Sequence, residues 1–182
     1  MVLIDTNIST LLYRYPTSIL YGQLNLLDSH DVSRFFTVCN QNIDKMELAV
    51  LFQMTFPGMP CVFYGDEKGI IGEEEFEYRS PMPWRNEHVL EEIYQKLIFL
   101  RKSKPALQHG DFTTIIAAGY EYAYCRTWKD QKITVVMNLG TDDVQSTGRA
   151  GTLILKKGEN HGIIKQFEYE VREDIIDVSD NL

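Results

Sequence analysis

The order of apolar patterns along the chain limits the folds that it can adopt more than any other feature. Before His109-Gly110, short strand-like apolar runs alternate with helical patterns, and after it only strand-like segments follow. Alternation of this kind predicts βα units with a parallel sheet, whereas strands alone predict an antiparallel domain. We therefore expect an α/β domain over residues 1–109 and a small all-β domain over residues 110–182.

The expected elements of the first domain follow from caps, prolines and apolar spacing. A helix around residues 10–20 should break at Pro16, because proline interrupts the backbone hydrogen bonds of a helix. Residues 44–47 have the spacing of a capping box and predict a largely buried helix that ends before Pro57. The remaining expected elements are a strand over 23–27, a strand over 60–64, and an amphipathic helix that starts from Asn86 as N-cap and ends before Pro105.

The second domain should contain a hairpin and further antiparallel strands. Residues 120–125 and 133–139 are apolar runs joined by the polar turn 128–132, and more strands are expected around 152–155 and 166–171. Tyr120, Tyr122, Tyr124 and Trp128 alternate along the first of these strands. Alternation is typical of a strand that buries one face, although exposed aromatic rings could also form a platform for sugars.

Composition excludes several classes of function. The 182 residues carry a net charge of −8, which argues against a nucleic-acid-binding protein with a clustered basic surface. The longest nearly apolar run, residues 48–56, is far shorter than the roughly 20 residues that cross a bilayer. Three widely spaced cysteines and no signal-peptide pattern at the N-terminus favour a reducing, cytoplasmic location.

A dense group of polar side chains follows the first predicted strand. Residues 28–34 contain His30, two aspartates and Arg34 immediately after an apolar run. One interpretation is a turn in which Asp28 and Ser29 bond the local backbone while Asp31 pairs with Arg34. A second is a metal-dependent phosphohydrolase, but the remaining histidines are scattered, so the sequence indicates no metal site.

Three motifs in this region resemble the α-amylase family of glycoside hydrolases, especially its cyclomaltodextrinases and neopullulanases. Residues 26–35, with the sequence LLDSHDVSRF, resemble the family's conserved region at the end of the seventh barrel strand. Residues 51–67 resemble its seventh helix and eighth strand, and residues 79–84, RSPMPW, resemble its Arg-x-Pro-Met-x-Trp loop. The three motifs occur in the family's order.

This resemblance implies a fold and an incomplete active site. The first domain would contribute the last βα units of a (β/α)₈ TIM barrel, followed by a small antiparallel β-sandwich as C-terminal domain. A complete barrel takes roughly 250 residues. The family's nucleophilic Asp and general-acid Glu would lie upstream, and no Gly-x-Arg-x-Asp pattern occurs in this sequence.

The resemblance also assigns roles to particular residues. Asp31 matches the family's third catalytic carboxylate, which holds hydroxyls of the reacting sugar, and His30 matches a residue that hydrogen-bonds the same sugar. Arg79 and Glu75 resemble a pair that grips a neighbouring sugar, although Arg79 could equally be the counter-charge of a solvated acidic loop. Asp66 and Glu67 are expected to bond the backbone after the eighth strand.

The sequence thus predicts the C-terminal part of an enzyme that hydrolyses α-1,4-glucosidic bonds in cyclodextrins, pullulan or maltooligosaccharides, and predicts that this part alone is inactive. The alternative is a non-catalytic carbohydrate-binding or interaction module. The expected partner is an α-glucan oligosaccharide, without nucleic acid or membrane. No cofactor is indicated, and calcium stays open. A parallel strand edge without a neighbour favours a homodimer, because unpaired amides invite another chain.

Overall fold

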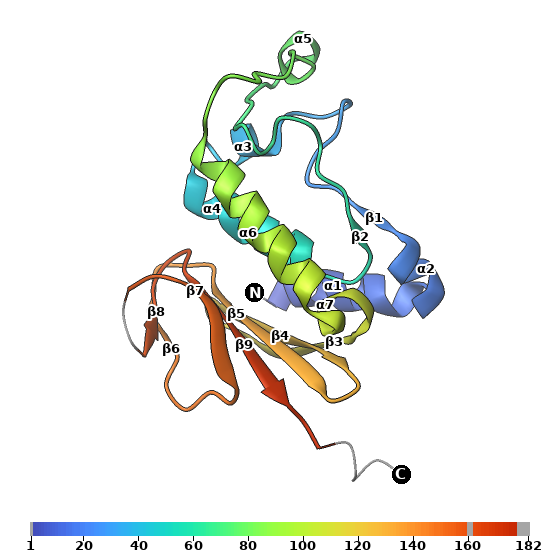
Figure 1. The fold of residues 1–182 in the computed structure, drawn as a ribbon, viewed down its shortest axis with the longest axis vertical. Coiled ribbons are helices and arrows are strands. Elements are labelled where there is room, and N and C mark those ends of the chain that lie inside the picture. The colour runs from blue at the N-terminus through green and yellow to red at the C-terminus, as the bar shows by residue number, and fades with distance from the viewer. Residues whose placement is uncertain (1, 160–161, 178–182) are drawn as a thin grey trace. The chain divides into compact units, whose positions relative to one another are not determined.

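The structure is a computed structural model that describes residues 2–159 and 162–177 (Figure 1). It divides into two compact units. One comprises Gln23–Ser103, and the other combines the N-terminal residues up to Gly22 with the chain from Lys104 onward. The domain division at residues 109 and 110 stays a prediction, because compact units of a structure need not coincide with family domains.

The unit of residues 23–103 is built on a parallel strand pair. β1 (Leu24–Asn25) pairs with β2 (Met59–Pro60), and the connection between them contains α3 (Phe35–Val38) and α4 (Ile43–Thr55). The buried side chain of Gln53 on α4 donates to the backbone oxygens of Asn25 and Cys61, at 2.8 and 3.1 Å. The crossover helix is thereby tied to both strands. The predicted strand over 60–64 is shorter than expected, since only its first residue is in the ladder.

The predicted N-cap of α4 is wrong, although the helix itself is confirmed. Asn42, and not Asp44, caps it, because the Oδ1 of Asn42 accepts from the amide of Lys45 at 2.9 Å. Asp44 lies inside the first turn, where its negative charge suits the positive end of the helix dipole. The buried residues of α4 lie on most of its circumference, as its nearly continuous apolar sequence predicted.

α6 (Val89–Ser103) packs against α4 in the same unit. Its buried positions recur at three- and four-residue steps, which confirms the predicted amphipathic helix; they are Leu90, Ile93, Tyr94, Leu97 and Leu100. The helix begins at Val89, three residues after the predicted cap, and His88 Nδ1 accepts from the amide of Leu90 at 3.3 Å. The short helix α5 (Glu75–Tyr78) lies in the long connection between β2 and α6.

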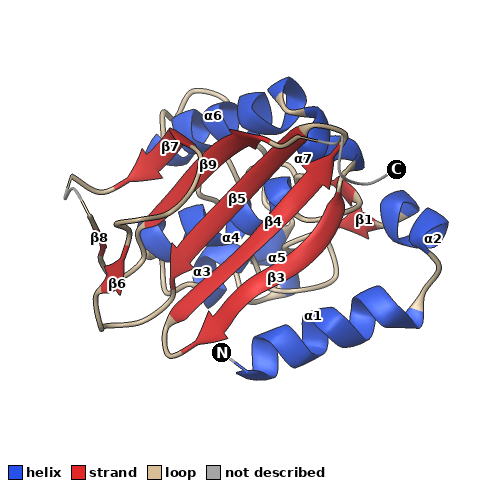
Figure 2. Ribbon diagram, turned by 90° about the horizontal axis from the view of Figure 1, so that it is seen from below, coloured by secondary structure: helices blue, strands red, loops and turns tan. Residues whose placement is uncertain are grey.

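The described residues of the other unit form three helices and antiparallel β structure. α1 (Val2–Arg14) and α2 (Thr17–Gly22) are separated at Pro16, as predicted, and α7 is Pro105–His109. The larger sheet has the order β3-β4-β5-β9-β7 (Figure 2). Its strands are β3 (Asp111–Ala118), β4 (Glu121–Trp128), β5 (Gln131–Asn138), β9 (Tyr169–Ile175) and β7 (Thr152–Lys157).

A second, two-stranded sheet completes a small sandwich. β6 (Val144–Gln145) pairs with β8 (Ile163–Ile164), and Val144 and Ile164 pack with Ala123 and Val136 of the larger sheet. On β4, the side chains of Tyr122 and Tyr124 are buried. βα elements with a parallel pair, followed by antiparallel β structure, confirm the predicted fold class.

Candidate functional site

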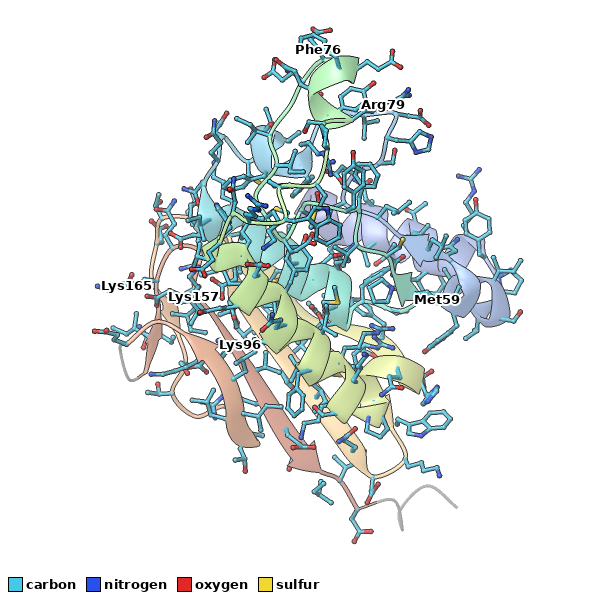
Figure 3. All side chains as sticks on the ribbon, turned by 45° about the horizontal axis from the view of Figure 1, so that its top comes forward. Met59, Phe76, Arg79, Lys96, Lys157 and Lys165 are labelled. Atoms are coloured by element: carbon cyan, nitrogen blue, oxygen red, sulfur yellow. The ribbon has the colours of Figure 1, made fainter. Side chains whose placement is uncertain are left out.

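The four residues that the sequence singled out lie together in the unit of residues 23–103. His30 and Asp31 follow β1, while Glu75 and Arg79 belong to α5 and its C-terminal end. Figure 3 shows Arg79 and Phe76 at the α5 end of this unit. More than 40 residues separate the two pairs along the chain, so the fold and not the local sequence brings them together.

Arg79 is the centre of this cluster. Its Nε donates to the backbone oxygen of His30 at 2.9 Å, and its Nη2 lies 3.4 Å from Asp31 Oδ1. Its Nη1 is 2.6 Å from Glu75 Oε1, one helical turn earlier. His30 Nε2 in turn lies 3.3 Å from Asp31 Oδ2. One guanidinium therefore fixes the two segments that carry the predicted site.

The cluster is open to solvent. Exposed fractions of the side chains are 66% for His30, 67% for Asp31, 45% for Arg79 and 68% for Glu75. Ion pairs at such exposure contribute only about 0–1 kcal/mol to stability. Stability therefore does not account for the arrangement, whereas an imidazole, two carboxylates and a guanidinium that reach solvent could hydrogen-bond the hydroxyls of a sugar.

The alternative interpretation, an ordinary turn, is correct in part. Ser29 Oγ accepts from the amide of Asp31 at 3.3 Å, and Asp28 Oδ2 accepts from the amide of Phe35 at 2.6 Å. The pairing of Asp31 with Arg34 that this interpretation also contains is wrong. Arg34 turns inward and is fully buried, and Asp31 pairs with Arg79 instead.

Arg34 joins three segments beneath the cluster. Its Nη1 donates to the backbone oxygen of Tyr64 at 2.7 Å and its Nε donates to that of Tyr78 at 2.9 Å. The same Nη1 lies 3.3 Å from Asp66 Oδ1, and the guanidinium carbon is 4.2 Å from the ring centre of Phe63. Because Tyr78 directly precedes Arg79, these bonds hold the backbone from which Arg79 reaches the site.

A buried pair of carboxyl groups accompanies Arg34. Asp28 and Asp66 are each only 3% exposed, and the charge of Asp28 acts on Asp66. Burial, reinforced by the neighbouring charge of Asp28, raises the pKa of Asp66 to about 8. Burial likewise raises the pKa of Asp28. At neutral pH the pair therefore retains a proton on Asp66, and the remaining negative charge is balanced by Arg34.

Sequence reasoning missed Arg34 as the organiser of the site. In the sequence, Arg34 stands three residues after Asp31, and this spacing suggested an ion pair between the two side chains within one turn. Glu67 behaves as predicted, since its Oε2 accepts from the amide of Gly65 at 2.9 Å. Within residues 2–159 and 162–177, no three His, Cys, Asp or Glu side chains are grouped as metal ligands.

Comparisons with known proteins bear on the family and the fold. The family described as "Alpha amylase, catalytic domain" matches residues 4–88. A cyclomaltodextrinase of Thermoanaerobacter pseudethanolicus is 38% identical over 137 residues, which are 74% of this chain and 24% of that protein. Neopullulanase 2 of Thermoactinomyces vulgaris is 39% identical over 153 residues, which are 81% of this chain and 25% of that protein. The chain thus spans about a quarter of the length of these relatives.

Solved structures extend the similarity over nearly the whole chain. A debranching enzyme of Nostoc punctiforme, soaked with acarbose, superimposes with a TM-score of 0.80 at 29% identity, covering 92% of this chain and 37% of that one. A cyclomaltodextrinase structure superimposes with a TM-score of 0.70 at 30% identity, covering 91% of this chain and 30% of that one. Together with the parallel βα elements and the antiparallel β domain, these matches show that the chain resembles the C-terminal part of α-amylase-family glycoside hydrolases of the cyclomaltodextrinase and neopullulanase type.

Proposed function

We propose that this chain is the C-terminal part of an enzyme that hydrolyses α-1,4-glucosidic bonds in cyclodextrins, pullulan or maltooligosaccharides. The names of the relatives support this substrate class. The observation that carries the proposal is the exposed cluster in which Arg79 contacts Asp31, Glu75 and the backbone of His30. Its members are the residues that match the family's sugar-binding positions.

Each member of the cluster has a role in this proposal. Asp31 accepts hydrogen bonds from hydroxyls of the reacting sugar and favours the distorted ring, which approaches the oxocarbenium-like transition state. His30 hydrogen-bonds the same sugar. Arg79 fixes the carboxylate of Asp31 and, with Glu75, binds the neighbouring sugar. Retaining hydrolysis also requires a nucleophile and an acid/base group about 5–5.5 Å apart, and these two carboxylates are assigned to segments outside the 182 residues.

The 182-residue chain by itself is therefore expected to release no reducing sugar from γ-cyclodextrin. Asp31 assists the reaction but replaces neither the nucleophile nor the acid/base group. The measurement is a reducing-sugar assay with the purified chain, with the Asp31→Asn variant as control. Sugar release that the wild-type chain shows and the Asp31→Asn variant lacks would disprove this assignment of catalytic groups.

A second candidate is a non-catalytic carbohydrate-binding module in the antiparallel part. It is favoured by Trp128, which is 40% exposed, with the ring of His109 centred 5.4 Å away. Exposed aromatic rings are suited to stacking on sugars. The cluster around Arg79, however, offers sugar hydroxyls a guanidinium, two carboxylates and an imidazole, whereas the ring beside Trp128 is a single imidazole.

Calorimetric titration with maltotriose separates the two candidates. Our account expects weak, saturable binding that decreases at least tenfold in His30→Ala and is unchanged in Trp128→Ala. Loss of binding in Trp128→Ala alone would favour the module and contradict the proposed site. Circular dichroism of both variants would establish that they retain the fold.

Partners and location belong to the same proposal. With a net charge of −8, a nucleic-acid partner is not expected. No helix in the described part of the chain has both the length and the apolar character that a membrane span requires. For the 182-residue chain by itself, the uncovered edges of the parallel pair support a homodimer, and the free thiols of Cys39, Cys61 and Cys125 support a cytoplasmic location.

A further inference from the structure

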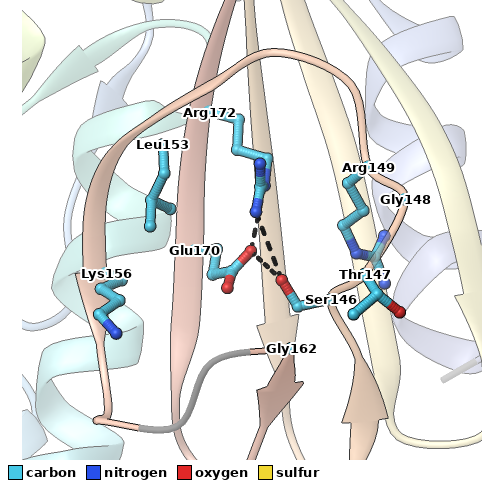
Figure 4. A pocket seen from close by; sticks show the side chains of 9 residues that line it. All are labelled: Ser146, Thr147, Gly148, Arg149, Leu153, Lys156, Gly162, Glu170 and Arg172. Carbon is cyan, nitrogen blue, oxygen red and sulfur yellow. Dashed lines mark hydrogen bonds and ion pairs between the residues drawn. The ribbon is translucent and has the colours of Figure 1, made fainter.

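A separate polar pocket lies in the antiparallel unit. It has a volume of about 190 Å³ and is formed by strands β7 and β9 together with the segment after β6 (Figure 4). The side chains that give it its chemistry are Ser146, Arg149, Lys156, Glu170 and Arg172. None of them belongs to the unit that carries His30 and Asp31.

Buried hydrogen bonds hold one wall of this pocket in place. Glu170 is only 5% exposed, and its Oε2 accepts from Ser146 Oγ at 2.5 Å and from Arg172 Nε at 3.1 Å. Arg172 Nη1 also donates to the backbone oxygen of Gly151 at 3.1 Å. Its Nη2 has only a 3.4 Å contact with Ser146 Oγ. The guanidinium is therefore fixed in position, while Nη2 keeps capacity to donate.

The charges around the pocket leave an excess of positive charge. Arg172 is balanced by Glu170, and Arg149 by Glu121, whose Oε1 lies 2.6 Å from Arg149 Nη2. The third cation, Lys156, has no ion-pair partner within the described residues. This local excess contrasts with the net charge of −8 for the whole chain. An anion in the pocket would thus face one lining cation, Lys156, that no described carboxylate neutralises.

The size and the lining residues of the pocket indicate which kind of anion fits it. A volume of about 190 Å³ is below the roughly 300–1,000 Å³ of sites for drug-sized ligands. Among the described residues, no aromatic side chain lines it, so they offer a sugar ring no stacking surface there. Arginine binds phosphate through directed hydrogen bonds, and lysine binds it as a point charge. We propose that this pocket binds a phosphate group, either free or carried by a small phosphate monoester.

Amide chemical shifts of the full chain, titrated with inorganic phosphate at constant ionic strength, test the proposal. We expect saturable shifts at Thr147 and Gly148, which line the pocket. In Lys156→Gln the affinity should fall at least fivefold. The matched control is Lys129→Gln, in the exposed turn between β4 and β5, which should bind as the wild type does. Absence of saturable shifts, or equal binding by Lys156→Gln, would overturn the proposal.

Two further ligands distinguish the source of the phosphate group. If glucose 1-phosphate shifts the same amides at equal or higher affinity, the pocket accepts a phosphate monoester. If only inorganic phosphate binds, the pocket is a site for the free ion. Maltose is the neutral control and should leave these amides unchanged. Equal shifts with maltose would show that hydroxyl groups and not phosphate are recognised, and would contradict the proposal.

Discussion

Replacing Arg34 with methionine is expected to lower the free energy of unfolding by about 3–5 kcal/mol, because it removes one partner of a buried ion pair. The backbone oxygens of Tyr64 and Tyr78 would lose their donors. The negative charge of the Asp28 and Asp66 carboxyl groups would lose its counter-ion. Urea unfolding, followed by the loss of helical circular dichroism at pH 7, measures the change.

Two comparisons make this prediction specific. Arg85→Met removes an exposed arginine from the same unit and should change the free energy by less than about 0.5 kcal/mol. Arg34→Lys keeps the charge but cannot reproduce the directed bonds of the guanidinium, so its loss should be intermediate. If Arg34→Met were as stable as Arg85→Met, the buried network would not hold the loops as described.

The Asp66→Asn variant is expected to change how stability depends on pH. The pKa of Asp66 is about 8 in the folded chain, mainly because the carboxyl group is buried, against an ordinary value of 3.8. Between these values the folded state binds more protons than the unfolded state, so stability falls as the pH rises, by about 1.4 kcal/mol per pH unit for one proton. The amide that replaces the carboxyl group does not titrate, and this part of the slope should disappear.

The measurement is the free energy of unfolding of both proteins at several pH values from 5 to 8. The difference between Asp66→Asn and the wild type should grow in favour of the variant as the pH rises. Asp28→Asn removes the negative charge that faces Asp66, whereas Arg34 still stabilises its ionised form. In Asp28→Asn, the fall of the free energy of unfolding with pH should therefore stop at a lower pH than in the wild type. Parallel profiles for the wild type and Asp66→Asn would contradict the raised pKa of Asp66.

Local patterns predicted those elements that bury a regular stripe of residues. α6 is an example, because helical spacing is a property of neighbouring residues, and the polar turn 128–132 likewise predicted the β4–β5 hairpin. The sequence did not predict β3. This strand is defined by its pairing with β4, in which Asp111 lies opposite Thr127. The grouping of residues before Gly22 with the chain after Lys104 likewise depends on contacts between distant segments, which no local pattern contains.

The candidate site was predictable through the resemblance rather than through residue spacing. His30 and Asp31 stand out as polar residues after a strand, but nothing local connects them with Glu75 and Arg79. The inward direction of Arg34 could not be predicted either, because the atoms that it binds are mostly backbone oxygens, which every residue has. The roles of the four site residues stay predictions until sugar binding is measured.

The central claim is that these 182 residues work as part of a longer α-glucan hydrolase. Size fractionation of the source cells, followed by mass spectrometry of peptides from this chain, tests it most directly. The account predicts that the peptides occur in a protein several-fold heavier than 21.1 kDa, since the chain spans about a quarter of its relatives. Peptides found only in a 21.1 kDa protein would contradict it, because that protein would lack the family's nucleophile and acid/base group.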